Sequence, residues 1–435
     1  RRRAVHAQRV LAAIQCMRSA SSQPYSSAQR PLVVLAAVAA IALADAATMQ
    51  CARPLRVAVI GGGVSGCTLA HALKEEVAAG RVATTLFEMG RGGGGRSATR
   101  KTRDDGRVAI SHGAPSFKVT TQKFRALLDG LPAGTTKPLP KPVGALVGDA
   151  FEPDGDDRRA GAGGAAALCD ALLRDSGADP RFRSMVRGIE RADDGAWALR
   201  GTDGSELGRF DWLAVSGNGV AHDRWTATFG GEPPLKAAAA SLGDAALDAA
   251  IAAVNGVTSK PVMAVMLAFD GAAAKSWAAL PWSKAAVDGD DVLARVVVER
   301  VSDDVTNVVL HSTHAFAEKN RDVYGATSTA ARVGGAMSDA SREDALVAAL
   351  LSSAEARLAA FDAALAGPFY GPHLHRWGSA FPAGVLVPPD AAVVPSARVV
   401  FLGDYVDTGR AGTLEGAALS GLAAAEALVD AAAAA

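Results

Sequence analysis

The sequence is poor in aromatic residues, cysteine and net charge, and the shortages of cysteine and of net charge each argue against a class of function. Aromatic residues make up 5% of the 435 residues, and 45 basic side chains balance 45 acidic ones. Nucleic-acid-binding proteins usually carry a basic face, so the zero formal net charge argues against such a partner. The four cysteines show no metal-ligand spacing, which argues against a zinc site, a disulfide framework and thiol-based chemistry.

Apolar residues are abundant instead. They make up 49% of the chain, which suits a soluble globular protein with a substantial core. The length allows two domains, or one large domain that carries an insertion. The acidic stretch 154–157 lacks the ligand arrangement of a cation site, so we expect solvated surface there and no metal.

Residues 1–50 differ in composition from the rest of the chain. They contain no acidic residue before Asp45 but many arginines and serines, which is typical of an organelle transit peptide. The apolar run 31–44 is too short for a comfortable membrane span and matches a signal-peptide core. Alternatively, translation starts at Met49 and the stretch is untranslated. The first case predicts a plastid or another organelle, the second predicts the cytoplasm, and neither predicts a stable membrane span in the mature protein.

The strongest pattern is the stretch RVAVIGGGVSGCTLAHALKEEVAAGRVATTLFE at residues 56–88. Its predicted elements are a buried parallel strand at 57–60, a helix at 64–79 and a second strand at 82–87. Between the first strand and the helix, Gly61, Gly63 and Gly66 form G-x-G-x-x-G. The first glycine permits a tight turn, the second lets backbone approach a pyrophosphate, and the third lets the helix pack close to the strand.

Glu88 ends the second strand, 22 residues after Gly66. A carboxylate at this distance accepts hydrogen bonds from ribose hydroxyls, and an acid rather than a base favours FAD or NAD over NADP. The helix N-terminus adds free N–H groups and a positive dipole end for the phosphates. The stretch therefore predicts a dinucleotide-binding site.

Two further segments fit the same ligand. Gly92 to Gly95 form a flexible loop that ends in Arg96, and such a loop with a guanidinium suits a diphosphate. Near the C-terminus, a predicted strand at 398–405 contains Gly403 and Asp404, and a helix is expected from Gly412 to about residue 430. The N-terminus of this helix suits the electron-rich edge of a flavin or its phosphate, and Asp404 suits a ribityl hydroxyl.

The middle of the chain predicts further strands and helices, and those between residues 261 and 365 suggest a separate substrate-binding layer. The expected strands lie at 181–189, 197–200, 210–217, 261–269, 295–299 and 305–311. The expected helices lie at 164–173, 235–254 and 341–365, and loops are expected at 131–142 and 148–164.

Three sequence segments together resemble a known family. Residues 91–100 match R-G-x-G-G-R-x-A-T-R, 112–114 continue with H-G-A, and 412–421 match G-T-x-E-G-A-x-x-S-G. This pattern resembles the two-dinucleotide-binding-domain flavoproteins, and most of all the renalase-like branch of the amine-oxidase superfamily. Family members commonly have an acid where Ser111 stands, and Gln and an aromatic residue where Pro115 and Ser116 stand. These departures put the substrate in doubt rather than the cofactor.

The resemblance implies an α/β fold with a discontinuous Rossmann-like FAD/NAD(P)-binding domain on a parallel sheet, and an inserted α+β substrate domain with a mixed sheet. It implies non-covalent FAD, because no cysteine lies near 403–421. The implied domains are FAD-binding segments at 55–118, 158–235 and 385–435, and substrate-domain segments at 119–157 and 236–384. The implied cofactor-binding residues are Gly61, Gly63, Val64, Ser65, Gly66, Glu88, Met89, Gly94, Gly95, Arg96, His112, Val186, Ser216, Gly217, Gly403, Asp404, Gly412, Thr413, Leu414 and Ala417.

Three functional hypotheses follow. The first is an FAD-dependent oxidase of a small molecule, amine-like or reduced-nicotinamide-like, in which hydride passes to the flavin. The second is a desaturase or isomerase of an apolar substrate that uses the same cofactor. The third is a non-catalytic flavin-binding protein. Since flavin chemistry requires no particular acid or base, the catalytic residues stay unknown; His375-Arg376-Trp377 resembles an H-R-W segment that lies toward the family's active site.

Overall fold

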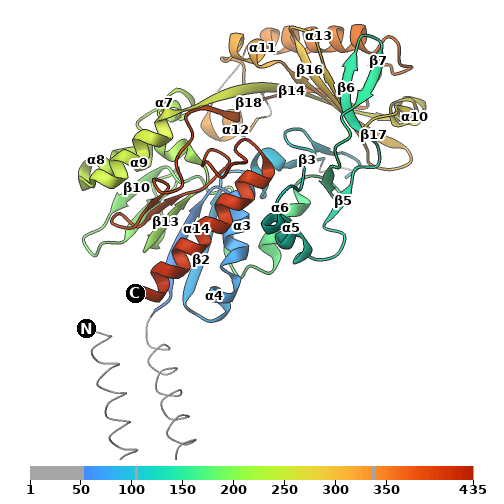
Figure 1. The fold of residues 1–435 in the computed structure, drawn as a ribbon. Coiled ribbons are helices and arrows are strands. Elements are labelled where there is room, and N and C mark those ends of the chain that lie inside the picture. The colour runs from blue at the N-terminus through green and yellow to red at the C-terminus, as the bar shows by residue number, and fades with distance from the viewer. Residues whose placement is uncertain (1–52, 103–105, 327, 336–338, 435) are drawn as a thin grey trace, which may run out of the picture. The chain divides into compact units, whose positions relative to one another are not determined.

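The computed structural model describes residues 53–434 except 103–105, 327 and 336–338. The expected targeting or untranslated segment, residues 1–50, lies outside the described residues. Leu55–Ala435 forms one unit, built from two large sheets and the helices that cover them (Figure 1). The chain is thus the expected α/β protein.

The first large sheet has six strands in the order β19-β20-β13-β1-β2-β9. Its central strand β1 pairs in parallel with β2 on one side and β13 on the other, and only the edge strand β19 runs antiparallel. The strands are β1 (Leu55–Ile60), β2 (Val82–Glu88), β9 (Asp179–Phe182), β13 (Trp212–Val215), β19 (Val393–Val394) and β20 (Val399–Phe401).

Both faces of this sheet are covered, because alternate apolar residues of each strand point to opposite sides. Val57 and Val59 of β1 lie in one core cluster and Ala58 and Ile60 in the other. The first cluster is covered by α3 (Val64–Ala72), α5 (Gln122–Asp129), α6 (Ala167–Arg174) and α14 (Leu414–Ala434). α14 lies beside α3 in Figure 1, and a Cβ at Gly421 would stand 2.5 Å from the Ser65 carbonyl oxygen.

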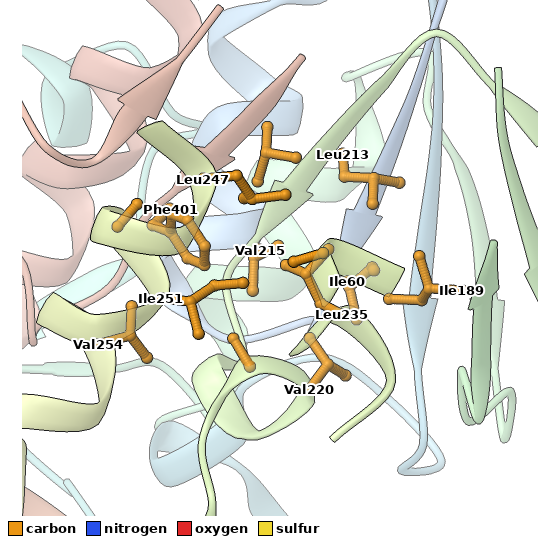
Figure 2. Packing of buried hydrophobic residues seen from close by; sticks show 14 of the residues in the cluster. Ile60, Ile189, Leu213, Val215, Val220, Leu235, Leu247, Ile251, Val254 and Phe401 are labelled. Carbon is orange, nitrogen blue, oxygen red and sulfur yellow. The ribbon is translucent and has the colours of Figure 1, made fainter. Parts of the chain in front are cut away.

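The opposite face is covered by α8 (Pro234–Leu242) and α9 (Ala245–Gly256). Figure 2 shows Val215 and Phe401 of the sheet packed against Leu247, Ile251 and Val254 of α9. A three-stranded antiparallel sheet adds to this side; its strands are β10 (Gly188–Arg191), β11 (Trp197–Arg200) and β12 (Glu206–Phe210).

The second large sheet has seven strands in the order β18-β14-β17-β16-β15-β6-β7 and is mixed, because β15 pairs in parallel with β6 while the other pairs are antiparallel. The strands are β6 (Val143–Val147), β7 (Ala150–Pro153), β14 (Val257–Asp270), β15 (Lys284–Val287), β16 (Leu293–Arg300), β17 (Val305–Ser312) and β18 (Tyr370–Gly384).

One face of the seven-stranded sheet packs against helices α10 (Gly271–Ala279), α11 (His314–Lys319) and α13 (Ala340–Arg357). On the other face, Ala264, Met266 and Val309 pack against Val108 and Ile110, which belong to the segment after β2. This second face therefore looks toward the segments that bear the glycine motifs.

The remaining elements are short. They are the helices α4 (Lys74–Ala78), α7 (Arg224–Phe229) and α12 (Thr329–Gly334), the turns η1 (Gly95–Ser97) and η2 (Asn218–Ala221), and the paired strands β3 (Thr99–Lys101) with β4 (Ala109–Ser111) and β5 (Thr136–Pro138) with β8 (Arg159–Gly161).

Several predicted elements are wrong in extent. The expected helix 235–254 is two helices, because Gly243 adopts a left-handed φ of 64° and the Asp244 side chain caps α9. The expected helix 341–365 is capped by Asp339 and ends at Arg357. The helix expected at 64–79 breaks at Leu73 into α3 and α4.

Two stretches of the middle segment also differ. The expected strand 181–189 is interrupted between β9 and β10, where Arg183 has a positive φ of 56°. The loops expected at 131–142 and 148–164 contain β5, β7 and β8. Because α9 packs on the six-stranded sheet, the chain leaves that sheet's core at Val257, the start of β14, rather than at the expected residue 236.

Candidate functional site

A cavity of about 920 Å³ runs from the carboxyl ends of the parallel strands to the open face of the seven-stranded sheet. Its lining includes Gly61, which follows β1, Glu88, which ends β2, and Ser216, which follows β13. In open α/β sheets the crevice at these carboxyl ends is where ligands bind. The cavity therefore lies at the position that the fold favours for a ligand.

The glycine turn after β1 is shaped by close backbone contacts. Gly61 has a φ of 109°, and a Cβ there would stand 2.8 Å from the Gly217 nitrogen. A Cβ at Gly66 would stand 2.2 Å from the Gly61 carbonyl oxygen, whereas a Cβ at Gly63 would meet nothing within 4 Å. Gly61 and Gly66 thus serve the packing of the turn, and Gly63 keeps the cavity open at the start of α3.

Glu88 is held in place by backbone amides. Its carboxylate accepts hydrogen bonds from Gly62 N at 2.8 Å and from Gly90 N at 2.6 Å. Burial raises the pKa of Glu88, and these two hydrogen bonds act in the opposite direction. A carboxylate oxygen has two lone pairs, so each Glu88 oxygen retains an acceptor site for a ligand hydroxyl.

The second glycine loop is tied to the first, since Gly94 N donates to Gly62 O at 2.8 Å. Beyond it, the Arg96 guanidinium binds both Asp404 carboxylate oxygens, at 2.6 and 2.5 Å, and the Ala380 carbonyl at 2.8 Å. The sequence predicted that Arg96 binds a diphosphate and that Asp404 binds a ribityl hydroxyl. In the structure the two side chains pair with each other. This pair joins chain segments 308 residues apart at one wall of the cavity.

The C-terminal motif closes the same wall. Gly403 has a φ of 155°, and a Cβ there would meet the Tyr405 ring at 2.3 Å. Glu415 in the first turn of α14 accepts hydrogen bonds from the backbone and hydroxyls of Thr120 and Thr121, which leaves the helix start fixed against the first segment. Thr413, at the start of α14, lines the cavity.

The floor of the cavity is a row of residues across the seven-stranded sheet. Arg295 on β16 is paired with His311 on β17, His311 with Ala264 on β14, and Ala264 with His375 on β18. Paired residues of adjacent strands share a face, so these side chains stand side by side on the cavity face. Trp377, two residues along β18, lies on this face with its ring 4.3 Å from that of His375.

Three histidines are neutral at ordinary pH: His311 and His375 of the sheet, and His112, which follows β4 and packs against this row and completes the floor. Burial lowers the pKa of His112 to about 4 and that of His311 to about 3, and it lowers the pKa of His375 well below the usual range. His112 completes an aromatic cluster, with its ring 4.7 Å from His375 and 5.1 Å from Trp377. These rings therefore form an uncharged aromatic surface at the floor, and none of the three histidines is protonated to act as an acid.

Basic side chains predominate in the lining, which has nine basic and three acidic members among the described residues. The basic residues are Arg91, Arg96, Arg100, Lys101, Arg183, Arg224, Arg295, Arg332 and Arg376, and the acidic residues are Glu88, Asp170 and Asp404. The cavity is therefore electropositive although the whole chain has a formal net charge of zero.

The structure brings most of the predicted cofactor-binding residues into this lining. Those that line it are Gly61, Gly63, Val64, Ser65, Glu88, Met89, Gly94, Gly95, Arg96, His112, Ser216, Gly217, Gly403, Asp404, Gly412, Thr413, Leu414 and Ala417. Gly66 and Val186 lie outside it. Gly66 packs α3 against the turn, and Val186 is buried in the core cluster with Ile60 and Phe87.

The sequence did not single out Arg183, Arg295, Arg332 or His311 as site residues, although all of them line the cavity. The positive φ of Arg183 and the sheet register that pairs Arg295 with His311 carry no local sequence signal. His375 and Trp377 were indicated only by the family resemblance.

A carboxylate stands near Ser111, where the family commonly has an acid. Burial raises the pKa of Glu299 to about 7, while the Ser111 N–H and hydroxyl lower it. The Ser111 hydroxyl oxygen also accepts a hydrogen bond from Ala165 N at 3.0 Å. An acid from β16 thus accompanies the serine that replaces the acid in the motif.

No group of three or more potential metal ligands occurs among the described residues. Within that part of the chain, α14 alone is long and apolar enough to cross a membrane by length and composition. Its buried residues Ala418, Ala424 and Leu428 belong to the core cluster that includes α3.

Two family models match the chain. The family "NAD(P)-binding Rossmann-like domain" matches residues 59–131, and "Flavin containing amine oxidoreductase" matches residues 147–429. The second match spans more than half of the chain. Comparison with curated protein sequences gives no significant match.

Solved structures of similar fold cover most of the chain. A protein from Exiguobacterium sp. 255-15 assigned as protoporphyrinogen oxidase has 13% identity and a TM-score of 0.59, over 86% of this chain and 98% of its own. Wild-type putrescine oxidase bound to putrescine has 12% identity and a TM-score of 0.56, over 87% of this chain and 100% of its own. At these identities the likeness shows the fold alone.

Proposed function

Because the chain belongs to the flavin-containing amine oxidoreductases and is an FAD-dependent oxidoreductase, we propose that it oxidises a C–H bond next to nitrogen in a small molecule. The substrate is amine-like or resembles a reduced nicotinamide. FAD, when bound, supplies the hydride acceptor at its N5 and passes the electrons to O₂ or another acceptor.

The residues at the strand ends fit FAD. The open space in front of Gly63, the free amides at the start of α3 and the spare acceptor sites of Glu88 suit a diphosphate and a ribose. Gly63 and Glu88 would hold the ADP part of FAD, while Thr413 and Leu414 at the start of α14 would face its flavin part.

One observation carries the proposal. A single cavity joins the glycine turn and Glu88 to the floor of His112, His311, His375 and Trp377. A substrate on this floor would share one continuous space with the cofactor. The neutral histidines and Trp377 would position the substrate and exclude water, and none of them would need to carry a charge.

The lining disfavours the second hypothesis, a desaturase or isomerase of an apolar substrate. A long hydrocarbon would have to lie against the guanidinium of Arg295 on the cavity floor. Burying this charge against hydrocarbon, where it gains no partner, costs free energy. The polar floor therefore favours a small polar substrate.

An absorption spectrum of the purified protein tests the proposal, followed by anaerobic mixing with NADH isomers and with a panel of amines. Oxidised-flavin bands that bleach with one of these reductants would support it. Bands that bleach with none of them would point to a non-catalytic flavin protein. No bands after reconstitution with FAD would refute the proposal.

A further inference from the structure

We infer that the substrate carries an anionic oxygen group, a carboxylate or a phosphate, and that Arg295 binds this group at the cavity floor. The inference rests on the proposed function, because it names the substrate class for the same site. It begins from the state of the Arg295 side chain.

Arg295 has no hydrogen-bond or ion-pair partner among the described residues, and its Nε atom is buried. Other cations stand near it: burial and then Arg158 lower the pKa of Arg295, and burial together with Arg295 lowers the pKa of Lys284 to about 7. A poorly solvated guanidinium beside like charges is unfavourable, and a bound oxyanion would remove the penalty. The planar guanidinium also matches a carboxylate or phosphate by two parallel hydrogen bonds.

His311 provides a second unused group next to Arg295. Its Nε2 lies 3.0 Å from the His112 carbonyl oxygen, which only accepts, so Nε2 carries the proton. The neutral ring then leaves Nδ1 as a lone-pair acceptor, and this atom is buried without a partner in the described part of the chain. Buried polar atoms are normally satisfied, so the pair presents a donor for an anion and an acceptor for an N–H or O–H.

The acidic lining residues do not offset this charge at the floor. Glu88 is engaged by the glycine turns, and Asp404 by Arg96. Asp170 lies on α6, at the side of a second small cavity of about 390 Å³. Among the described residues, a dicationic amine would therefore meet arginine and no free carboxylate at the floor, whereas an amine with an anionic group would find complementary charge.

Isothermal titration of the full-length holoprotein with benzoate tests the inference, with neutral benzamide and cationic benzylamine as matched probes and phenyl phosphate as the second anion. The variant Arg295→Gln should weaken benzoate binding about 10- to 100-fold, the loss expected for a charge-assisted bond. Its benzamide affinity should not change. Arg295→Lys should bind anions with intermediate affinity.

The control variant is Arg300→Gln on the same strand, whose side chain is exposed and paired with Asp303. It should bind benzoate as the wild type does. Since Arg295 has no partner in the described part of the chain, Arg295→Gln should unfold at the same temperature as the wild type or a higher one, whereas a merely structural arginine would give a lower temperature. Which anion loses more affinity, benzoate or phenyl phosphate, assigns the group as carboxylate or phosphate.

The inference is overturned if Arg295→Gln binds both anions as tightly as the wild type, or if benzylamine binds the wild type more tightly than either anion. The proposed oxidation is tested separately by flavin content and anaerobic bleaching. Anion binding through Arg295 without bleaching by any amine or NADH isomer would refute the oxidation and leave the anion site in place.

Discussion

Two alanine substitutions in the glycine turn should have opposite effects on folding and on cofactor binding. In Gly66→Ala the new Cβ would stand 2.2 Å from the Gly61 carbonyl oxygen, roughly an ångström inside ordinary contact. Both atoms are fixed by backbone, so neither can rotate away. Overpacking of this kind costs about 3 kcal/mol, and the better helix propensity of alanine returns about 1 kcal/mol. The apoprotein should lose about 2 kcal/mol of unfolding free energy.

Gly63→Ala should leave the fold nearly unchanged. Gly63 has a φ of −73°, which alanine adopts without strain, and its Cβ would meet nothing within 4 Å. The loss of a glycine cap and the reduced entropy of the unfolded chain are each about 0.5–1 kcal/mol and oppose one another. The new methyl group would instead occupy the space in front of α3 that the FAD pyrophosphate needs. Losing one charge-assisted hydrogen bond there weakens FAD binding about 10- to 100-fold.

Urea unfolding of the two apoproteins and titration of each with FAD, followed by flavin fluorescence, provide the comparison. The wild-type apoprotein is the reference for both. Wild-type FAD affinity in Gly63→Ala would refute the assignment of the pyrophosphate to this turn. Wild-type stability in Gly66→Ala would refute the packing argument.

Three further substitutions probe the surroundings of the site. Arg96→Met should cost about 3 kcal/mol in urea unfolding, because it leaves the carboxylate of Asp404, 5% exposed, without its cation; adding Asp404→Asn should restore much of the loss, and a single variant of wild-type stability would contradict the role of the pair. Burial raises the pKa of Glu299 from 4.5 to about 7, so its protonation stabilises the folded state below about pH 4.5, and this contribution is lost as the pH rises to 7. Glu299→Gln should remove up to about 3 kcal/mol of that pH dependence. If the unfolding free energies of the variant and the wild type change with pH in the same way, Glu299 is not the source of the pH dependence. Tyr405→Phe removes the hydrogen bond from the phenol to Val215 O at 2.7 Å and should lower the unfolding free energy by about 1 kcal/mol, measured by the same method; an unchanged value would show that the bond adds nothing to stability.

The parts of the fold that the sequence predicted well are those encoded locally. The spacing of Gly61, Gly63 and Gly66 is required by the close contacts and open space of one turn, so it predicts that turn directly. The short apolar run of β1 likewise follows from burial of the strand on both faces. The family resemblance then supplied the discontinuous arrangement and its C-terminal segment, and the six-stranded sheet combines strands from separate stretches of the chain, β1 and β2, β9 and β13, and β19 and β20.

The parts that could not be predicted depend on contacts between distant segments. Arg295 and His311 meet because β16 and β17 pair in one register, and a shift of one residue would turn both side chains to the other face. The Arg96–Asp404 pair joins residues 308 positions apart, and either side chain alone suggested a different partner. Gly243 and Arg183 interrupt the predicted helix and strand because both have a positive φ, which the residue type alone does not reveal.

The long pairing of β14 with β18 limits how this enzyme can be recombined with its relatives. Val257 at the start of β14 belongs to the core of the six-stranded sheet, while Val265 on the same strand belongs to the core of the seven-stranded sheet. The two halves are therefore joined by a hydrogen-bonded ladder, with register shifts between Lys260 and Val262 and between Met266 and Ala268, rather than by a flexible tether. A chimera that exchanges the half with the seven-stranded sheet must cut both strands at one pair of residues, Val257 opposite Gly384, because cuts at different pairs would leave unpaired backbone where the halves join.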